Sequence, residues 1–475
     1  MNAKLLPLVA LVPCACSNDC SGAVRQDAPE KPNILIIMTD QQSYNTVSAL
    51  SQYYPGEVYA STPNIDRLVR NGLSFTRAYC ANPLSAPSRF ALFTGRYPGH
   101  LGKRRNTDTP AEEPVRAIQE NSGMGTVFRA AGYETIYGGK VHLDYSNFKP
   151  GATSMFSAPT GYGFDNYYIK DEREPLAEAS ARMLHDLAAK QKEDGNKPFL
   201  MVVSFLNPHD ICKEYSTNLS DEIIPDQYKP EISETIAAMR ARMKAIDENL
   251  FYGSIAPVLP ANRLKTADFP NTQKQRFVDY PDTYWRQYRW IYGQLVSLVD
   301  SHIGIVLDAL DSEPELLKNT LVVFTSDHGE MQGAHGTGTK SLPFEECQKI
   351  PFIFTGAGVS HRGVSGIPVC NGTDLLPTLC EMAGLETPAG LDGVSLASVI
   401  KTGKAGKSLK SRKYIFSEGE TFVTVWSDNY KFTYYDLDNG KTLLIDLGKD
   451  PGEMKNVGAQ YPAVADKLSK VIAER

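Results

Sequence analysis

Residues 33–42 read NILIIMTDQQ, an unbroken apolar run that ends in polar residues. Apolar and β-branched residues without alternation are typical of a strand that is buried on both faces. The same signature returns at residues 199–205, 321–325 and 351–354. Helical patterns lie between these runs, and the clearest are residues 62–71, with Thr62 as N-cap before Pro63, and residues 284–310. This alternation predicts an α/β fold: a large, mainly parallel sheet sandwiched by helices.

From about residue 410 the pattern changes to short strands separated by turn residues. The predicted strands are residues 414–416, 422–426, 430–435 and 442–445, with turns at Asp428-Asn429 and Asn439-Gly440. A last helix is predicted at residues 463–473. We therefore expect a large domain over residues 31–405 and a small C-terminal antiparallel-sheet α+β subdomain over residues 406–475.

The first 30 residues resemble an export leader followed by a linker. Lys4 is basic, residues 5–12 are nearly all apolar, and Ala15-Cys16 precedes a polar stretch. The apolar run is too short to cross a bilayer, which takes about 20 residues. Processing as a lipoprotein at Cys16, cleavage without lipidation, and an uncleaved apolar tail all remain open. The first two predict export to the periplasm or to the outer membrane of a bacterium.

Composition narrows the class of protein further. The chain has 475 residues and a formal net charge of −6, which argues against nucleic acid as a partner. The basic cluster Lys103-Arg104-Arg105 could still meet an anionic ligand, or it could be a solvated loop. Five cysteines follow the leader without any CxxC spacing, so no zinc cluster is indicated and no disulfide is assigned.

Acidic residues follow two of the predicted strands. Asp40 comes after the first strand, and Asp327-His328 comes after the strand at residues 321–325. Because the carboxyl ends of parallel strands meet at one edge of the sheet, these side chains can converge on a cation. Oxygen-rich ligands favour calcium or magnesium. Each acidic residue alone could equally cap the next helix.

Residues 85–96 read SAPSRFALFTGR. On its own, this stretch is compatible with a serine before a short helix that begins near Pro87 and ends at Gly95. It also fits a signature of Cys or Ser, any residue, Pro, Ser and Arg, then Thr-Gly-Arg. On this signature the chain resembles the formylglycine-dependent sulfatases of the alkaline phosphatase-like superfamily. Within that family it is similar to the type I, serine-type enzymes, to bacterial glycan sulfatases and to iduronate-2-sulfatase-like enzymes.

Further segments match the family in the same order along the chain. They are residues 138–143 (GGKVHL, with Val141 in place of the usual Trp), 207–210 (NPHD), 327–330 (DHGE) with Lys340, and 450–456 (DPGEMKN). The match runs from about residue 32 to residue 456, nearly the whole chain after the leader.

The resemblance implies a cofactor and a set of site residues. Ser85 would be oxidised to formylglycine by an anaerobic sulfatase-maturating enzyme, and Ca²⁺ would be held by Asp40, Gln41, Asp327 and His328. Gln41 stands where many relatives have a second Asp. The implied catalytic residues are Ser85, Arg89, Lys140, His142, His209 and Lys340. The implied substrate-binding residues are Lys140, His209, His335, Lys340 and Arg104, of which His335 could instead be a supporting residue.

The implied reaction is hydrolysis of a sulfate ester. The formylglycine hydrate attacks sulfur, a covalent sulfo-enzyme intermediate forms, and a neighbouring base then releases sulfate. An O-sulfated carbohydrate (glycosaminoglycan, mucin or algal glycan) is the first candidate substrate, and small aromatic esters are the second. The alternatives are a phosphodiesterase or phosphonate hydrolase of the same superfamily, and a non-catalytic glycan-binding relative. Contact with a membrane is expected only through the N-terminal anchor.

Overall fold

A computed structural model describes residues 31–54, 56, 58–108, 110, 112–142, 159–194, 197–212, 229–263, 280–436 and 440–475. The predicted leader with Cys16 lies outside the described residues, and so does Asn439 of the second predicted turn. Both stay predictions.

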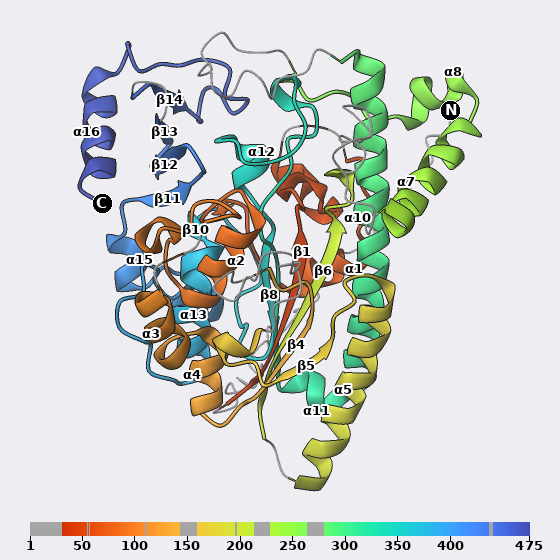
Figure 1. Cartoon of the computed structure of the whole chain (residues 1–475), viewed down its shortest axis with the longest axis vertical. Coiled ribbons are helices and arrows are strands. Elements are labelled where there is room, and N and C mark those ends of the chain that lie inside the picture. The colour runs from red at the N-terminus through yellow and green to blue at the C-terminus, as the bar shows by residue number, and fades with distance from the viewer. Residues whose placement is uncertain are drawn as a thin grey trace, which may run out of the picture.

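The centre of the molecule is an eight-stranded sheet (Figure 1). In sheet order the strands are β5 (Asn166–Ile169), β4 (Glu134–Gly139), β6 (Phe199–Pro208), β1 (Asn33–Asp40), β7 (Thr320–Ser326), β8 (Phe352–Gly356), β2 (Gly72–Phe75) and β9 (Gly363–Ser365). Only β8 runs against its neighbours β7 and β2, and the other pairs are parallel. The predicted mainly parallel sheet is therefore confirmed, although an apolar run could not reveal that residues 352–356 run the other way.

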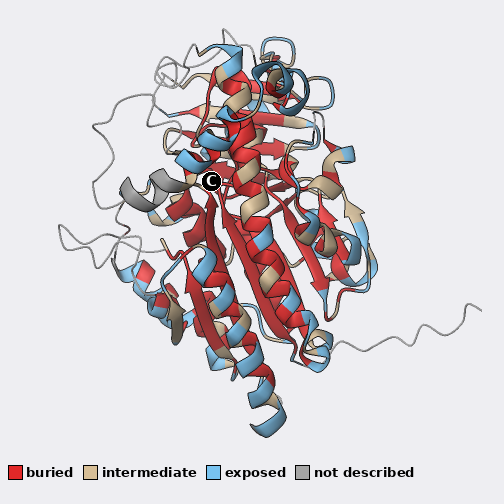
Figure 2. Ribbon diagram, turned by 90° about the vertical axis from the view of Figure 1, so that its right-hand side faces the viewer, coloured by how far each residue is buried: buried red, intermediate tan, exposed pale blue. Residues whose placement is uncertain are grey.

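Alternate residues of β1 feed two hydrophobic cores, one on each face of the sheet. Ile36 and Met38 belong to a core shared with α2 (Ser85–Thr94) and α13 (Asn371–Met382). Leu35 and Ile37 belong to a core shared with α5 (Glu174–Asp194) and α10 (Asp282–Asp311). Successive side chains of a strand point to opposite faces, so a strand covered on both sides has to be apolar throughout. Figure 2 shows buried strands beneath helices whose outer faces are exposed.

The two clearest helix predictions are confirmed with small shifts at their ends. Helix α1 (Pro63–Asn71) begins with Pro63 after Thr62, and the Thr62 hydroxyl donates to Asp66 (3.0 Å). Helix α10 extends the predicted residues 284–310 by a few positions.

Among the described helices, α10 alone is long and apolar enough to cross a membrane, yet 72% of that stretch is buried inside the molecule. Other helices are α3 (Glu112–Asn121), α4 (Met124–Ala130), α7 (Lys229–Lys244), α8 (Glu248–Leu250), α11 (Pro314–Lys318), α12 (Glu345–Gln348), α14 (Ala397–Thr402) and α15 (Lys407–Ser411).

The C-terminal part forms the predicted antiparallel sheet. Its strands, in order, are β11 (Ile415–Glu418), β12 (Phe422–Ser427), β13 (Tyr430–Tyr435) and β14 (Thr442–Asp446), and α16 (Pro462–Ala473) packs on them. A short parallel pair, β3 (Ala78–Tyr79) with β10 (Val369–Cys370), lies next to this sheet, and Tyr79 stacks on Trp426 with ring centroids 4.2 Å apart. The boundary at residues 405 and 406 stays a prediction.

Candidate active site

The predicted site residues gather at one end of the parallel strands. Six of them follow or end a strand of the central sheet: Asp40 in β1, Lys140 and His142 after β4, His209 after β6, and Asp327 and His328 after β7. Parallel strands carry their carboxyl ends at the same edge, which is where ligands bind in such sheets.

Two carboxylates and an imidazole converge at this edge. Ligand atoms of Asp40, Asp327 and His328 all lie within 4.8 Å of one another, and all three residues are fully buried. Gln41 follows with a positive φ of 70°, and its backbone N–H donates to Asp327 Oδ1 (3.0 Å). This donor set of carboxylates, an imidazole and an amide fits a divalent cation.

The charges of the two carboxylates also favour a cation between them. Burial and the charge of Asp40 raise the pKa of Asp327 to about 7, although Arg89 opposes the shift. Burial would raise the pKa of Asp40 too, but nearby cations, Lys140 first, hold it well below its ordinary value. A carboxylate held ionised next to a second buried carboxylate creates repulsion that a divalent cation would relieve.

Ser85 lies directly beside this cluster. Its hydroxyl oxygen is 3.0 Å from His328 Nε2, 3.3 Å from Asp40 Oδ1 and 3.4 Å from Lys340 Nζ. Helix α2 begins at Ser85 itself, two residues earlier than Pro87, and ends at Gly95 with a left-handed φ of 67°. The first turn of this ten-residue helix therefore carries position 85, where the helix dipole favours negative charge.

Arg89, one turn later on α2, links the elements of the site. Its guanidinium is fully buried and donates to Asp327 Oδ2 (2.9 Å), Asp40 Oδ2 (3.1 Å), Ser204 Oγ (2.8 Å) and the Lys140 carbonyl (2.9 Å). Four such bonds fix both carboxylates relative to the helix that carries Ser85.

Two lysines add positive charge on the same side. Lys140 Nζ lies 2.7 Å from Asp40 Oδ2, and Lys340 Nζ lies 2.7 Å from Gln41 Oε1. With Arg89, three cationic side chains surround two carboxylates, even before a metal ion is counted. Such a site attracts an anion and stabilises added negative charge.

Two partly exposed histidines complete the site. Burial, with the charge of Lys140 as the next cause, lowers the pKa of both His142 and His209 well below the ordinary value. Both rings are therefore neutral near pH 7 and can accept a proton.

Comparison with known proteins identifies the family of the chain. Residues 32–385 match the sulfatase family, and residues 333–475 match the C-terminal family of N-sulphoglucosamine sulphohydrolase. The chain belongs to the sulfatase family. The predicted membership, and with it the alkaline phosphatase-like fold, is confirmed.

Relatives of this sulfatase cover nearly its whole length. A Δ4,5-hexuronate-2-O-sulfatase of Bacteroides thetaiotaomicron is 30% identical, over 95% of this chain and 89% of the relative. An N-acetylglucosamine-6-O-sulfatase of the same bacterium is 26% identical, over 99% of this chain and 90% of the relative. The solved structure of a 2-O GAG sulfatase superposes with a TM-score of 0.70 at 26% identity, over 94% of this chain and 91% of that one.

Two predicted substrate-binding residues of the sulfatase have other partners in the structure. His335 is fully buried, its ring stacks on Phe344 (centroids 4.1 Å apart), and its backbone N–H donates to the Asn262 carbonyl (2.7 Å). Arg104 donates to the Gly419 carbonyl (2.8 Å) and pairs with Asp436 (2.6 Å). These contacts favour a supporting role for both residues, which was the stated alternative for His335.

Sequence reasoning gave no role to several residues that hold the site together. Ser204 accepts from Arg89, Tyr292 donates to the Gln41 carbonyl (2.6 Å), and Tyr288 donates to Glu330 (2.8 Å). Both tyrosines lie within the helix predicted at residues 284–310. Their spacing of four residues was the available signal, because it puts both hydroxyls on one side of the helix.

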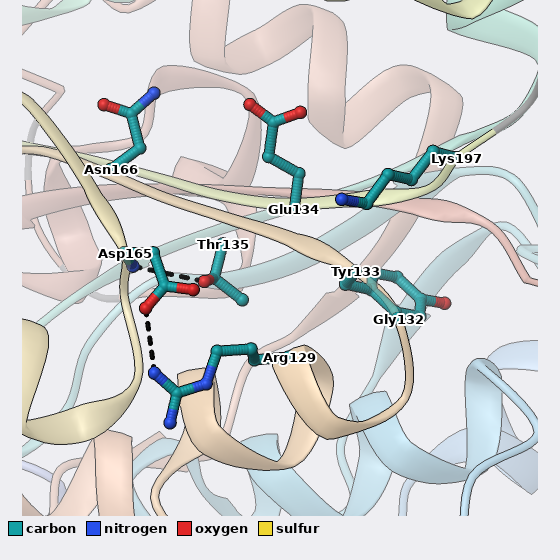
Figure 3. Close-up of a pocket in the computed structure, with 8 residues that line it drawn as sticks. All are labelled: Arg129, Gly132, Tyr133, Glu134, Thr135, Asp165, Asn166 and Lys197. Atoms are coloured by element: carbon teal, nitrogen blue, oxygen red, sulfur yellow. Dashed lines mark hydrogen bonds and ion pairs between the residues drawn. The ribbon is translucent and has the colours of Figure 1, made fainter. Parts of the chain in front are cut away.

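The sulfatase also has a hollow at the opposite end of the sheet (Figure 3). It has a volume of about 400 Å³ and is lined by Arg129, Gly132, Tyr133, Glu134, Thr135, Asp165, Asn166 and Lys197. Glu134 and Thr135 begin β4, whereas the active site follows its other end. Arg129 pairs with Asp165 across the hollow at 2.8 Å, so these two charges are already balanced.

Proposed function

We propose that this sulfatase hydrolyses O-sulfate groups on a carbohydrate, with formylglycine at position 85 and Ca²⁺ at the Asp40–Asp327–His328 cluster. The observation that carries the proposal is the position of Ser85, whose hydroxyl lies 3.0–3.4 Å from His328, Asp40 and Lys340. A nucleophile beside a cation site and two lysines suits attack on an anionic ester. The named activities of the relatives support the same reaction class.

Once in place, the cation and the hydrated aldehyde would together supply an acidic hydroxyl that attacks sulfur. Asp40, Asp327 and His328 would hold the cation, with Gln41 as a fourth ligand. Arg89 keeps both carboxylates in position through its buried hydrogen bonds.

Proton transfer and binding of the sulfate oxygens fall to the remaining residues. Lys140 and Lys340 would bind the sulfate oxygens, since both ammonium groups reach the Asp40 carboxylate beside Ser85. His142, which is neutral, would accept the proton that releases sulfate. Lys340 would protonate the departing alcohol oxygen, and the neutral His209 would assist by hydrogen bonding to that oxygen. The lowered pKa of His142 keeps its ring unprotonated, as a proton acceptor has to be.

The position of the sulfate on the sugar does not follow from family membership. One relative is named for the 2-O position of a hexuronate and another for the 6-O position of N-acetylglucosamine. Because specificity is built by loops around a shared fold, the two names support a sulfated sugar as substrate without fixing the position of the sulfate.

Maturation and location also belong to the proposal. A serine at position 85 points to an oxygen-independent maturating enzyme, and the leader with Cys16 points to export as a periplasmic protein or an outer-membrane lipoprotein. A sulfated polysaccharide is an external nutrient or host component, which agrees with an exported enzyme.

Matched sulfate and phosphate esters test the reaction class. With protein made beside a serine-type maturating enzyme, we expect kcat/KM for the sulfate ester to exceed that for the phosphate ester by about 10² or more. Sulfated disaccharides from glycosaminoglycans should be hydrolysed faster than aromatic sulfates. Faster turnover of phosphate or phosphonate esters would instead show that the protein is a phosphodiesterase or phosphonate hydrolase. Glycan binding without turnover of either ester would show that the protein is a non-catalytic glycan-binding relative.

A further inference from the structure

Glu330 is hydrogen-bonded to Gln41, the residue that follows Asp40 of the cation cluster, and takes no part in the proposed chemistry. Its fully buried carboxylate accepts four hydrogen bonds. Three of them reach Oε1, from the Tyr288 hydroxyl (2.8 Å) and the backbone N–H groups of Thr339 (2.5 Å) and Gln332 (3.4 Å). The fourth reaches Oε2 and comes from the side-chain amide of Gln41 (2.5 Å).

The neighbours of the Gln41 amide decide which of its ends faces the cluster. The Lys340 ammonium can only donate, so the amide oxygen faces Lys340 and the NH₂ end faces Glu330. The oxygen then points the other way, where Lys340 Nζ (2.7 Å) and Cys212 Sγ (3.3 Å) donate to it. Lys340 Nζ also lies 3.4 Å from Ser85 Oγ, so the amide oxygen is on the nucleophile side of the residue.

The backbone of Gln41 is fixed as well. Its left-handed φ of 70° is unusual for a residue with a side chain, and two bonds maintain it. Its N–H donates to Asp327 Oδ1 (3.0 Å), and its carbonyl accepts from the Tyr292 hydroxyl (2.6 Å). Tyr288 and Tyr292 lie one turn apart on α10, so a single helix face supports both Glu330 and Gln41.

We infer that Glu330 is a positioning residue that turns the Gln41 amide oxygen toward the Asp40–Asp327–His328 cluster and so makes Gln41 a neutral fourth ligand of the cation. The inference rests on the proposed cation site. A glutamine needs such a partner because its two ends have the same shape and opposite polarity, whereas either oxygen of an aspartate could serve.

The isosteric change Glu330→Gln tests this role. The three donors at Oε1 would keep an oxygen there, so the new NH₂ group would face the NH₂ group of Gln41 and force the Gln41 amide to turn over. We expect the affinity for Ca²⁺ to fall by about tenfold or more, as is usual when a residue that orients a ligand is lost. Calorimetric titration of the chelator-treated protein with Ca²⁺ measures this affinity.

Two further variants separate orientation from loss of charge. Glu346→Gln removes a half-buried carboxylate of this region, one that accepts from Asn262 Nδ2 (2.7 Å), and it should leave Ca²⁺ affinity close to that of the unaltered chain. The exchange Gln41→Glu with Glu330→Gln restores a donor facing an acceptor and should recover tight binding. Melting curves in chelator confirm that each variant is folded.

Unchanged Ca²⁺ affinity in Glu330→Gln would overturn the inference, and so would an exchange variant that binds as weakly as Glu330→Gln alone. If the unaltered chain does not bind Ca²⁺, that result contradicts the cation site of the proposed function, on which this inference rests.

Discussion

Ser85→Ala is expected to lower kcat for sulfate esters by about 10⁴–10⁶-fold, the loss seen when a catalytic nucleophile is removed. The alanine cannot be oxidised to an aldehyde, and it removes the hydroxyl that the structure places against His328, Asp40 and Lys340 at once. The fold should not change, because residue 85 is already in the first turn of α2, where alanine is tolerated.

The matched control for this variant is Ser85→Cys, made in a host whose maturating enzyme oxidises cysteine. It should recover most of the activity, since the same aldehyde results from either residue. Activity of Ser85→Ala close to that of the unaltered chain would show that another residue attacks the ester.

Asp327→Asn is expected to remove Ca²⁺ binding, while the free energy of unfolding in chelator should change by no more than about 1 kcal/mol. The change takes away one of two buried carboxylates at the cation cluster, but it also removes a charge that burial and Asp40 already disfavour, since they raise the pKa of Asp327 to about 7. Calcium titration and denaturant unfolding measure the two effects separately. Activity should fall with the loss of the metal ion, because the cation acidifies the attacking hydroxyl.

Asp374→Asn provides the comparison. Asp374 is a fully buried carboxylate too, and both of its oxygens pair with Arg412, at 2.6 and 2.7 Å. We expect this change to destabilise the fold by about 3 kcal/mol with unchanged Ca²⁺ affinity, because it breaks a buried ion pair and Asp374, on α13, is no part of the cation cluster. Full Ca²⁺ affinity in Asp327→Asn would show that the ion binds at a site other than the Asp40–Asp327–His328 cluster.

The sequence predicts those parts of the fold that local patterns determine. The run at residues 33–38 is apolar because both faces of β1 are covered, and this is readable from the residues alone. Strand β4 (ETIYGG) was missed as a strand because it is short and contains two glycines. The antiparallel direction of β8 was missed because an apolar run carries no sign of its direction.

The same limit applies to the site. Asp40, Ser85 and Asp327 were found because they stand at strand ends or in a recognisable segment. Ser204 and Glu330 act through bonds to residues more than 100 positions away, which no local pattern encodes. Arg104 shows the opposite case: a basic cluster suggests an anion, yet the structure gives its guanidinium partners in the C-terminal sheet.

The central claim is that residue 85 carries the catalytic aldehyde, and mass spectrometry of the peptide that contains Ser85 tests it most directly. The protein is made beside an active serine-type maturating enzyme, with a known substrate of that enzyme as positive control. The account predicts loss of two hydrogen atoms at Ser85 and reaction of the peptide with an aldehyde reagent. An unmodified serine beside a fully modified control would contradict it and would favour a non-catalytic glycan-binding protein.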